Sequence, residues 1–170
     1  MAERRNIILT GFMGTGKSEV GNLLAKRLQR KFLDTDMLIE QTAGQPIAHI
    51  FAEKGETYFR ELEKQVIRQV CQEQGVVIAT GGGAIVNTDN TACLKASGTV
   101  ICLTASPDTI VRRVQETKDR PLLQGEDPLA KIRSLLTARA TAYAQADLTI
   151  DTSTLNPNEV VETILVQLKV

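Results

Sequence analysis

The chain has no tryptophan, a single histidine and few aromatic residues, which make up 4% of its 170 residues. Aromatic side chains supply the surfaces on which the bases of single-stranded nucleic acids stack, so no such platform is expected. Basic and acidic residues are equally numerous, with 20 of each, and this balance predicts no broad positive surface. We therefore expect neither nucleic acid nor a membrane among the partners of the protein.

Long apolar runs are also missing. No stretch reaches the roughly 18 apolar residues that a membrane span requires, and the apolar part of MAERRNIILTGF is too brief for a secretory signal. The sequence therefore predicts a cytoplasmic protein, and its length fits one domain. The cysteines Cys71, Cys93 and Cys102 lack metal-ligand spacing and are expected to be reduced and mostly buried. His49 has apolar neighbours in IAHIF and is expected to be structural.

A glycine-rich segment, GFMGTGKS at residues 11–18, matches the phosphate-binding pattern G-x-x-x-x-G-K-[ST]. It follows the apolar run NIILT and precedes VGNLLAKRL, so a strand and a helix are expected to flank it. Backbone N–H groups of such a turn converge on phosphate oxygens, and the helix adds the positive end of its dipole. Lys17 would reach the β- and γ-phosphates, and Ser18 would offer a hydroxyl to Mg²⁺. The predicted ATP contacts here are Gly11, Gly14, Thr15, Gly16, Lys17, Ser18 and Glu19.

Short β-rich runs alternate with helical patterns along the chain. The five expected strands lie in RNIILT, KFLDTD, VVIAT, TVICLTA and DLTIDT. This alternation predicts an α/β fold in which a parallel sheet is covered by helices on both faces. Residues 37–73 read as a helical insertion, residues 115–127 as a lid, and the chain should end in an amphipathic helix. Ligands of such sheets bind at the carboxyl ends of the strands, where the glycine loop, DTD and GGG would meet.

The glycine loop alone does not specify a reaction. A GTP-dependent switch reads guanine with N/T-K-x-D, but the near match Thr117-Lys118-Asp119-Arg120 ends in arginine. A motor ATPase usually carries an acidic residue after a strand such as VVIAT, where this chain has Thr80 and three glycines. A kinase for a small acceptor is therefore favoured. The alternatives are a kinase for another hydroxy acid, such as gluconate, and a non-catalytic nucleotide-dependent module.

Several charged residues could form the acceptor side. Of Asp34 and Asp36, one could hold Mg²⁺ and the other could accept the acceptor's hydroxyl proton, although Asp36 could instead cap the next helix. Arg60 and Glu63 lie three residues apart on a predicted helix and, taken alone, suggest a surface ion pair of little energy. The glycines at 81–83 indicate either an ordinary loop or a close approach by a ligand. Arg139, on the helix after the lid, is individually a weak signal.

Taken together, GFMGTGKS, FLDTD, IFAEKGETYFRELE, ATGGGA, RPLL and LTARATAY occur in an order that resembles the shikimate kinase family, and the resemblance runs from about Ile7 to the end. It implies a P-loop, nucleoside-monophosphate-kinase-like fold with a five-stranded parallel sheet in the order 2-3-1-4-5. It also implies transfer of the ATP γ-phosphate to the 3-hydroxyl of shikimate, a step toward chorismate and the aromatic amino acids, with Mg²⁺ as cofactor.

On the nucleotide side, the resemblance implies that Ser18 and Asp34 hold Mg²⁺, with Asp34 acting largely through water. Arg113 would pack on adenine, and Asn156 would lie in the loop on the adenine side. Arg120, in the lid, would lie near the transferring phosphate and would be catalytic together with Lys17.

On the acceptor side, the resemblance implies that Asp36 binds the hydroxyls of shikimate and is the catalytic base. Arg60 and Arg139 would grip the carboxylate, as suits planar bidentate groups. Gly82 would contact the substrate through its backbone, and Glu63 would hold Arg60.

Two positions depart from the family pattern. Leu155 stands where a basic residue usually precedes the Asn-Pro pair, and Glu19 follows the P-loop where threonine is common. These differences concern contacts with adenine and phosphate rather than the fold. We expect a monomer that binds ATP and shikimate.

Overall fold

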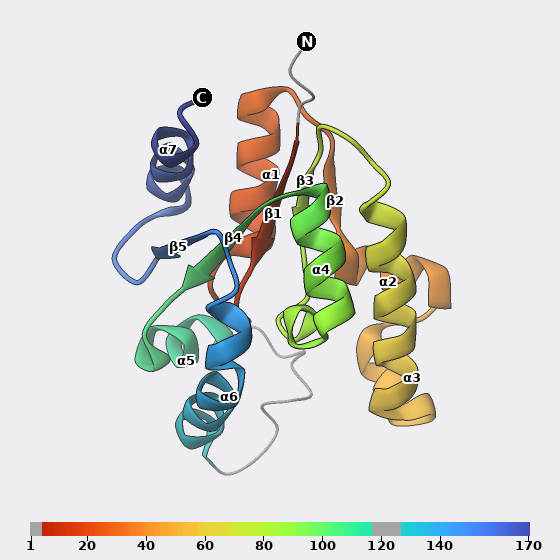
Figure 1. Cartoon of the computed structure of the whole chain (residues 1–170). Coiled ribbons are helices and arrows are strands. Elements are labelled where there is room, and N and C mark those ends of the chain that lie inside the picture. Colours follow the sequence, from red (N-terminus) through yellow and green to blue (C-terminus); the bar gives the residue numbers. More distant parts are fainter. Residues whose placement is uncertain (1–4, 117–126) are drawn as a thin grey trace.

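A computed structural model describes residues 5–116 and 127–170 of the chain. Within them, parallel strands form a sheet in the order β2-β3-β1-β4-β5 (Figure 1). The strands are β1 Asn6–Thr10, β2 Phe32–Asp34, β3 Val77–Ala79, β4 Gly98–Thr104 and β5 Leu148–Asp151. The strand positions expected from the sequence pattern are confirmed, and so is the order 2-3-1-4-5 that the resemblance implies.

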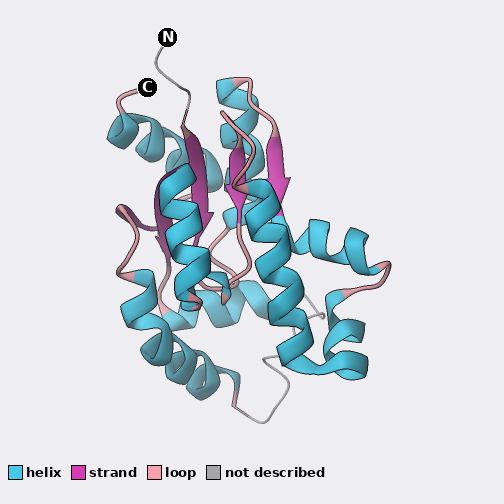
Figure 2. Ribbon diagram, turned by 45° about the vertical axis from the view of Figure 1, so that its right-hand side comes forward, coloured by secondary structure: helices cyan, strands magenta, loops and turns pink. Residues whose placement is uncertain are grey.

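Helices lie on both faces of this sheet, as Figure 2 shows in cyan around the magenta strands. They are α1 Lys17–Leu28, α2 Thr35–Ala43, α3 Ile47–Val70, α4 Thr88–Ser97, α5 Pro107–Gln115, α6 Pro128–Tyr143 and α7 Pro157–Leu168. Several begin at the caps that their sequences supply. Ser106 accepts a hydrogen bond from Thr109 N at the start of α5, and Pro107 follows it at the first helical position.

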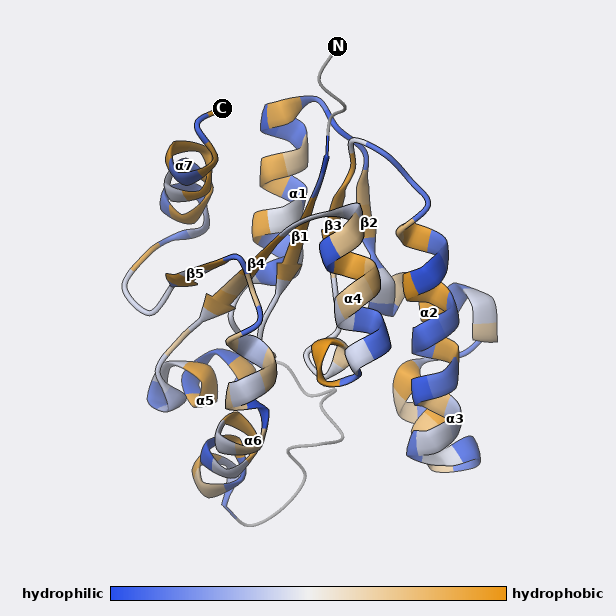
Figure 3. Cartoon of the chain, in the orientation of Figure 1, coloured by the Kyte–Doolittle hydropathy of each residue, from blue (hydrophilic) through white to orange (hydrophobic). Residues whose placement is uncertain are grey.

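The core is divided by the sheet into two apolar clusters, because successive strand residues point to opposite faces. Ile7 and Leu9 of β1 pack with α1 and α7, whereas Ile8 packs with α3, α4, α5 and α6. Strands buried on both faces are apolar at nearly every position, which explains the orange strands in Figure 3. Because all the paired strands are parallel, their carboxyl ends lie at the same edge of the sheet.

The expected insertion between the second and third strands is present, but it begins at Thr35 and contains two helices. Gly44, with φ 71°, ends α2, and Gly55, with φ 83° and ψ 173°, interrupts α3. Helix α4 was not identified from the sequence because its residues show little apolar periodicity. The lid expected at 115–127 falls almost entirely outside the described residues, as does Arg120. Of the helices in the described ranges, none is long and apolar enough to cross a membrane.

Candidate active site

The glycine loop joins β1 to α1 as its sequence predicts. Gly11 has φ 132°, and a Cβ on this residue would overlap the carbonyl oxygen of Leu103 in β4. Only glycine fits there, because the backbone passes directly beside the neighbouring strand. Gly16, also left-handed, precedes the first residue of α1, and Lys17 Nζ donates to Phe12 O at 2.9 Å. The N–H groups of the turn and the start of α1 thus form a phosphate-binding loop.

A hydroxyl and a carboxylate meet beside this loop. Ser18 Oγ donates to Asp34 Oδ2 at 2.6 Å, while Asp34 Oδ1 accepts from Asp36 N at 3.0 Å and Met37 N at 3.3 Å. The cap of α2 is therefore Asp34 and not Asp36, which corrects the alternative role considered for Asp36. Two hard oxygen donors in contact suit Mg²⁺, which keeps waters and phosphate oxygens as its other ligands. In the described part of the chain no cluster of three or more His, Cys, Asp or Glu residues could hold a metal by itself.

A cleft of about 860 Å³ opens over the P-loop and the carboxyl ends of the strands. Most residues predicted from the sequence line it: Gly14, Thr15, Gly16, Lys17, Ser18, Glu19, Asp34, Asp36, Arg60, Glu63, Gly82, Arg113 and Arg139. Gly11 and Asn156 do not line it. Asn156 instead caps α7, since its Oδ1 accepts from Glu159 N at 2.9 Å, and the cleft wall there consists of Leu155 and Pro157.

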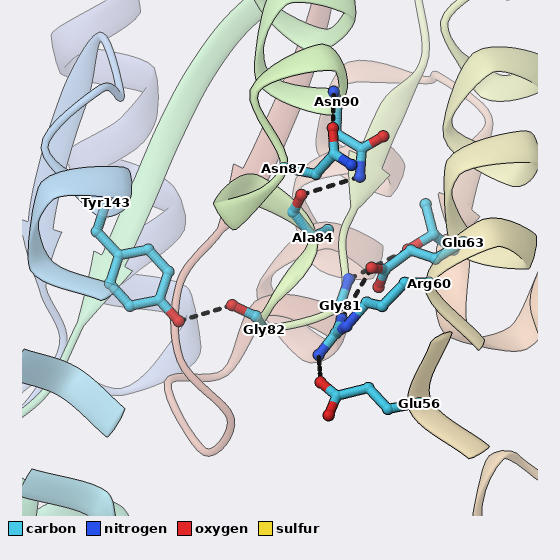
Figure 4. A network of polar contacts seen from close by, with 10 residues as sticks. Glu56, Arg60, Glu63, Gly81, Gly82, Ala84, Asn87, Asn90 and Tyr143 are labelled. Carbon is cyan, nitrogen blue, oxygen red and sulfur yellow. Dashed lines mark hydrogen bonds and ion pairs between the residues drawn. The ribbon is translucent and has the colours of Figure 1, made fainter. Parts of the chain in front are cut away.

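Arg60 and Glu63 form an ion pair whose carboxylate is buried and whose guanidinium is partly exposed, and not the surface pair that the two residues alone suggested. Glu63 is only 1% exposed, and its Oε1 accepts from Arg60 Nη1 at 2.8 Å (Figure 4). Burial raises the pKa of Glu63, and Arg60 opposes this effect. Glu56 contacts the same guanidinium at 3.4 Å. The spacing of the two residues could not reveal the burial of Glu63, because packing of the helices buries a charged residue that would ordinarily be expected to face solvent.

The turn at residues 81–83 is tightly surrounded by these charged groups. A Cβ on Gly81 would lie 2.8 Å from Asp36 Oδ1 and 3.0 Å from Glu63 Oε2. A Cβ on Gly83 would lie 2.7 Å from Arg60 Nη2 and 3.1 Å from Arg60 Cζ. The glycines therefore leave room for side chains of α2 and α3, and the segment is not an ordinary loop.

Arg139 projects from α6 into the same region, although it is about 80 residues from Arg60 in the sequence. Its residue is 8% exposed, and its guanidinium carbon lies 5.5 Å from the centroid of the Phe12 ring. Its Nη1 has no hydrogen-bond partner among the described residues. A buried cationic N–H without an acceptor is costly, so this atom marks a place where an anion would be stabilised.

Arg113 is held by hydrogen bonds from the terminal nitrogens of its guanidinium to the P-loop and to Thr152. Its Nη1 donates to Gly14 O and Thr152 Oγ1, each at 3.1 Å, and its Nη2 donates to Thr152 O at 2.8 Å. Thr152, which is 2% exposed, also contacts Thr15 O at 3.2 Å. The sequence analysis missed Thr152. Its only signal is a polar residue directly after the last strand.

The single histidine and the three cysteines have no catalytic geometry of their own. His49 is exposed and lines the cleft, so the apolar surroundings expected for it are not found. The three cysteines are free thiols, one buried and two half-buried. Burial raises the pKa of Cys71 to about 12 and that of Cys102 to about 11, so both remain protonated at neutral pH.

The sheet order, the P-loop and the adjoining acceptor cleft place this chain among the P-loop kinases of small molecules. The model of the family described as shikimate kinase matches residues 13–169. A shikimate kinase of Caldanaerobacter subterraneus subsp. tengcongensis is 47% identical over 161 residues, covering 95% of this chain and 94% of that protein. Another, of Desulforudis audaxviator, is 51% identical over 148 residues, 87% and 78% of the two chains.

Solved structures agree with these relatives. Shikimate kinase from Acinetobacter baumannii in complex with shikimate has a TM-score of 0.94 and 39% sequence identity to this chain, covering 97% of this chain and 93% of that one. The chain belongs to the shikimate kinase family, and it is an enzyme of the kinase class.

Proposed function

We propose that the chain transfers the γ-phosphate of ATP to the 3-hydroxyl of shikimate, giving shikimate 3-phosphate and ADP in the pathway to chorismate. Membership of the family supports this, and one observation in the site carries it furthest. Arg139 Nη1 is buried without a hydrogen-bond partner among the described residues, and it lines the same cleft as the paired Arg60. An acceptor that bears a carboxylate would supply both the missing hydrogen-bond acceptor and an opposite charge, whereas a neutral sugar would supply no charge.

The two arginines would divide the work of binding this carboxylate. Arg60 is anchored by Glu63 at 2.8 Å, so its guanidinium is held in one orientation before substrate arrives. Arg139 rests against the Phe12 ring, which orients the plane of its fork. Fixing both groups in advance lowers the entropic cost of binding the substrate. Gly82 would present its backbone between them, since it lies close to Arg139 and the P-loop.

The transfer itself would need a base and stabilisation of negative charge. Asp36 would accept the proton of the attacking hydroxyl while the new O–P bond forms and the bond between the γ-phosphorus and the bridging oxygen breaks. Lys17 and the P-loop N–H groups would bind the phosphates, and Arg120 would join them from the lid segment. Bound Mg²⁺, held through Ser18 and Asp34, would neutralise charge on the phosphate oxygens. Arg113 would offer its planar face to adenine, because its hydrogen bonds occupy its edge.

Several coarser features belong to the same proposal. The chain would act as one kinase domain and as a monomer in the cytoplasm, with ATP and shikimate as its ligands and with no nucleic acid or membrane partner. The equal numbers of acidic and basic residues support the last point.

The test is ADP release from ATP and Mg²⁺ with shikimate, quinate, gluconate and nucleoside monophosphates offered separately. We expect shikimate to be the preferred acceptor by a large margin in kcat/KM. Lys17→Ala, purified in the same way, is the control for contaminating kinases, because it removes a cation from the phosphate site without disturbing the core. It should fold and lack transfer activity. Preference for gluconate or a nucleotide, or turnover retained by Lys17→Ala, would contradict the proposal.

A further inference from the structure

One hydrogen bond in the acceptor region comes from a residue with no part in the site described so far. Tyr143 is the last residue of α6 and is 8% exposed. Its hydroxyl donates to the backbone oxygen of Gly82 at 2.6 Å, across 61 residues of sequence (Figure 4). This distance is short for an O–H···O hydrogen bond, so the hydroxyl is firmly directed at that carbonyl.

Gly82 occupies a critical position between the two halves of the site. A Cβ on this residue would lie 3.4 Å from Met13 N, 3.5 Å from Gly11 O and 3.6 Å from Arg139 Nη1. The backbone of Gly82 therefore lies beside both the P-loop and the arginine whose Nη1 lacks a partner, with room for little more than a methyl group between them. A small rotation of its peptide would change the distance between these groups.

The glycine turn has no side chains of its own by which it could be held, so its neighbours hold it. Gly81 N donates to the buried Thr35 Oγ1 at 3.1 Å, and Asn90 Nδ2 donates to Ala84 O at 3.0 Å. These two bonds secure the ends of the turn. Between them, the bond from Tyr143 fixes the peptide that joins Gly82 to Gly83. Because a trans peptide is planar, fixing its C=O also sets the direction of the Gly83 N–H.

Tyr143 also lies one helical turn after Arg139, on the same face of α6. The Arg139 guanidinium lies near enough to this hydroxyl to oppose the rise in the pKa of Tyr143 that burial causes. Burial raises the pKa of Tyr143, so the phenol stays protonated and remains a donor at neutral pH. One helix face thus carries both a cation of the acceptor site and the group that holds the backbone beside it.

We propose that Tyr143 is a positioning residue of the acceptor site: its hydroxyl locks the Gly82 peptide and Arg139 in the relative geometry that binds the acceptor's carboxylate. The inference rests on the proposed function, because it assumes a carboxylic acid acceptor. Tyr143 itself does not touch the reacting atoms. Its removal should therefore weaken binding of the acceptor more than it slows the chemical step, and should spare ATP.

The perturbation is Tyr143→Phe, which keeps the buried ring and removes only the hydroxyl. Tyr58→Phe is the matched control, since Tyr58 is 48% exposed and is the only other tyrosine. For Tyr143→Phe we expect the KM for shikimate to rise about 5- to 20-fold, as for a buried carbonyl that loses its donor. The kcat should fall about threefold or less, and the KM for ATP should stay within about twofold. Tyr58→Phe should match the wild type in all three.

A spectroscopic measurement addresses the same point without catalysis. The chain lacks tryptophan, so near-ultraviolet absorbance in Tyr58→Phe arises chiefly from Tyr143. Adding shikimate to that variant should produce a saturable tyrosine difference spectrum, because a carboxylate placed on Arg139 changes the environment of the adjoining hydroxyl. Tyr143→Phe should give no comparable signal. This readout remains informative even if Tyr143→Phe folds poorly.

The outcomes separate this inference from the proposed function. If the wild type prefers a different acid, the proposed substrate is wrong, and the same comparison with that acid still tests Tyr143. If Tyr143→Phe lowers the melting temperature but leaves the acceptor KM unchanged, Tyr143 is merely a core residue and the inference fails. Absence of any difference spectrum in Tyr58→Phe at saturating acceptor would also overturn it.

Discussion

Replacing Arg139 by lysine tests how the acceptor's acid group is bound. The substitution keeps the positive charge but removes the planar fork that can donate two parallel hydrogen bonds to a carboxylate. The site makes this loss hard to compensate. Arg139 is 8% exposed, so little water can replace the missing donor, and its Nη1 has no other partner in the described part of the protein. Lysine would also lose the contact of the guanidinium with the Phe12 ring.

The expected loss of affinity follows from the number of hydrogen bonds that the substitution removes. One charge-assisted hydrogen bond is worth about 1.5–3 kcal/mol, which corresponds to roughly 10- to 150-fold in binding. We expect Arg139→Lys to weaken shikimate binding within this range and to change ATP binding by less than about twofold. Arg133→Lys on the same helix is the control, because Arg133 is exposed and should tolerate the change.

The assay is a titration of two ligands against two proteins. A shikimate analogue with an uncharged amide in place of the carboxylate should bind the wild type poorly and should lose little more in Arg139→Lys. The four affinities form a cycle whose coupling energy measures the contact between Arg139 and the carboxylate. If the two losses simply add, Arg139 does not touch the carboxylate, and the assignment of the acceptor pocket is wrong.

Three other changes test neighbouring groups. Asp36→Asn should lower turnover by about 10²-fold or more with ATP affinity nearly intact, and near-normal ADP release would exclude Asp36 as the base. Gly83→Ala places a Cβ 2.7 Å from Arg60 Nη2, so the guanidinium should shift from its present position beside Glu63. The shikimate KM should then rise about 5- to 10-fold, and an unchanged KM would show that the exact position of Arg60 is unimportant. Burial raises the pKa of Glu63 above its ordinary 4.5, so the folded protein holds this proton more tightly than the unfolded chain does. The free energy of unfolding of the wild type should therefore fall as pH rises from about 4.5 through the raised pKa, and that of Glu63→Gln should not show this fall. On the acidic side, protonation of Glu63 should release Arg60 and raise the shikimate KM, and the same rise in Glu63→Gln would refute this.

The sheet could be predicted from the sequence because its strands are buried on both faces. Ile7, Ile8 and Leu9 are all at most 5% exposed, and such a run followed by a glycine loop has few alternatives. The carboxyl ends of parallel strands meet at one edge of the sheet, so the sequence predicts that the P-loop and Asp34 lie close together. Helix α4 could not be predicted from the sequence, because it is stabilised by packing against its neighbours and shows no amphipathic pattern of its own.

The acceptor side was less predictable because its properties depend on contacts between distant segments. The buried state of Glu63 is decided by how α3 packs, and the unpaired state of Arg139 Nη1 is decided by how α6 meets the P-loop. Local patterns report neither. Only similarity to a family linked Arg60 with Arg139, and nothing in the sequence pattern singled out Tyr143, whose partner is a backbone atom 61 residues away.

The charges of the acceptor site explain why these contacts would favour an acid. Glu63 is buried against Arg60, and its field is opposed by Arg139 and reinforced by Asp36. Arg60 therefore already has a carboxylate partner, whereas Arg139 contacts the Phe12 ring and leaves its Nη1 without a hydrogen-bond partner among the described residues. An incoming carboxylate would gain most from the arginine that lacks an anionic partner and would use the anchored one mainly for orientation. Arg139 would then contribute most of the affinity for the carboxylate, and the Arg60–Glu63 pair would set its orientation. The glycine turn allows both arginines to approach the same small volume beside the P-loop.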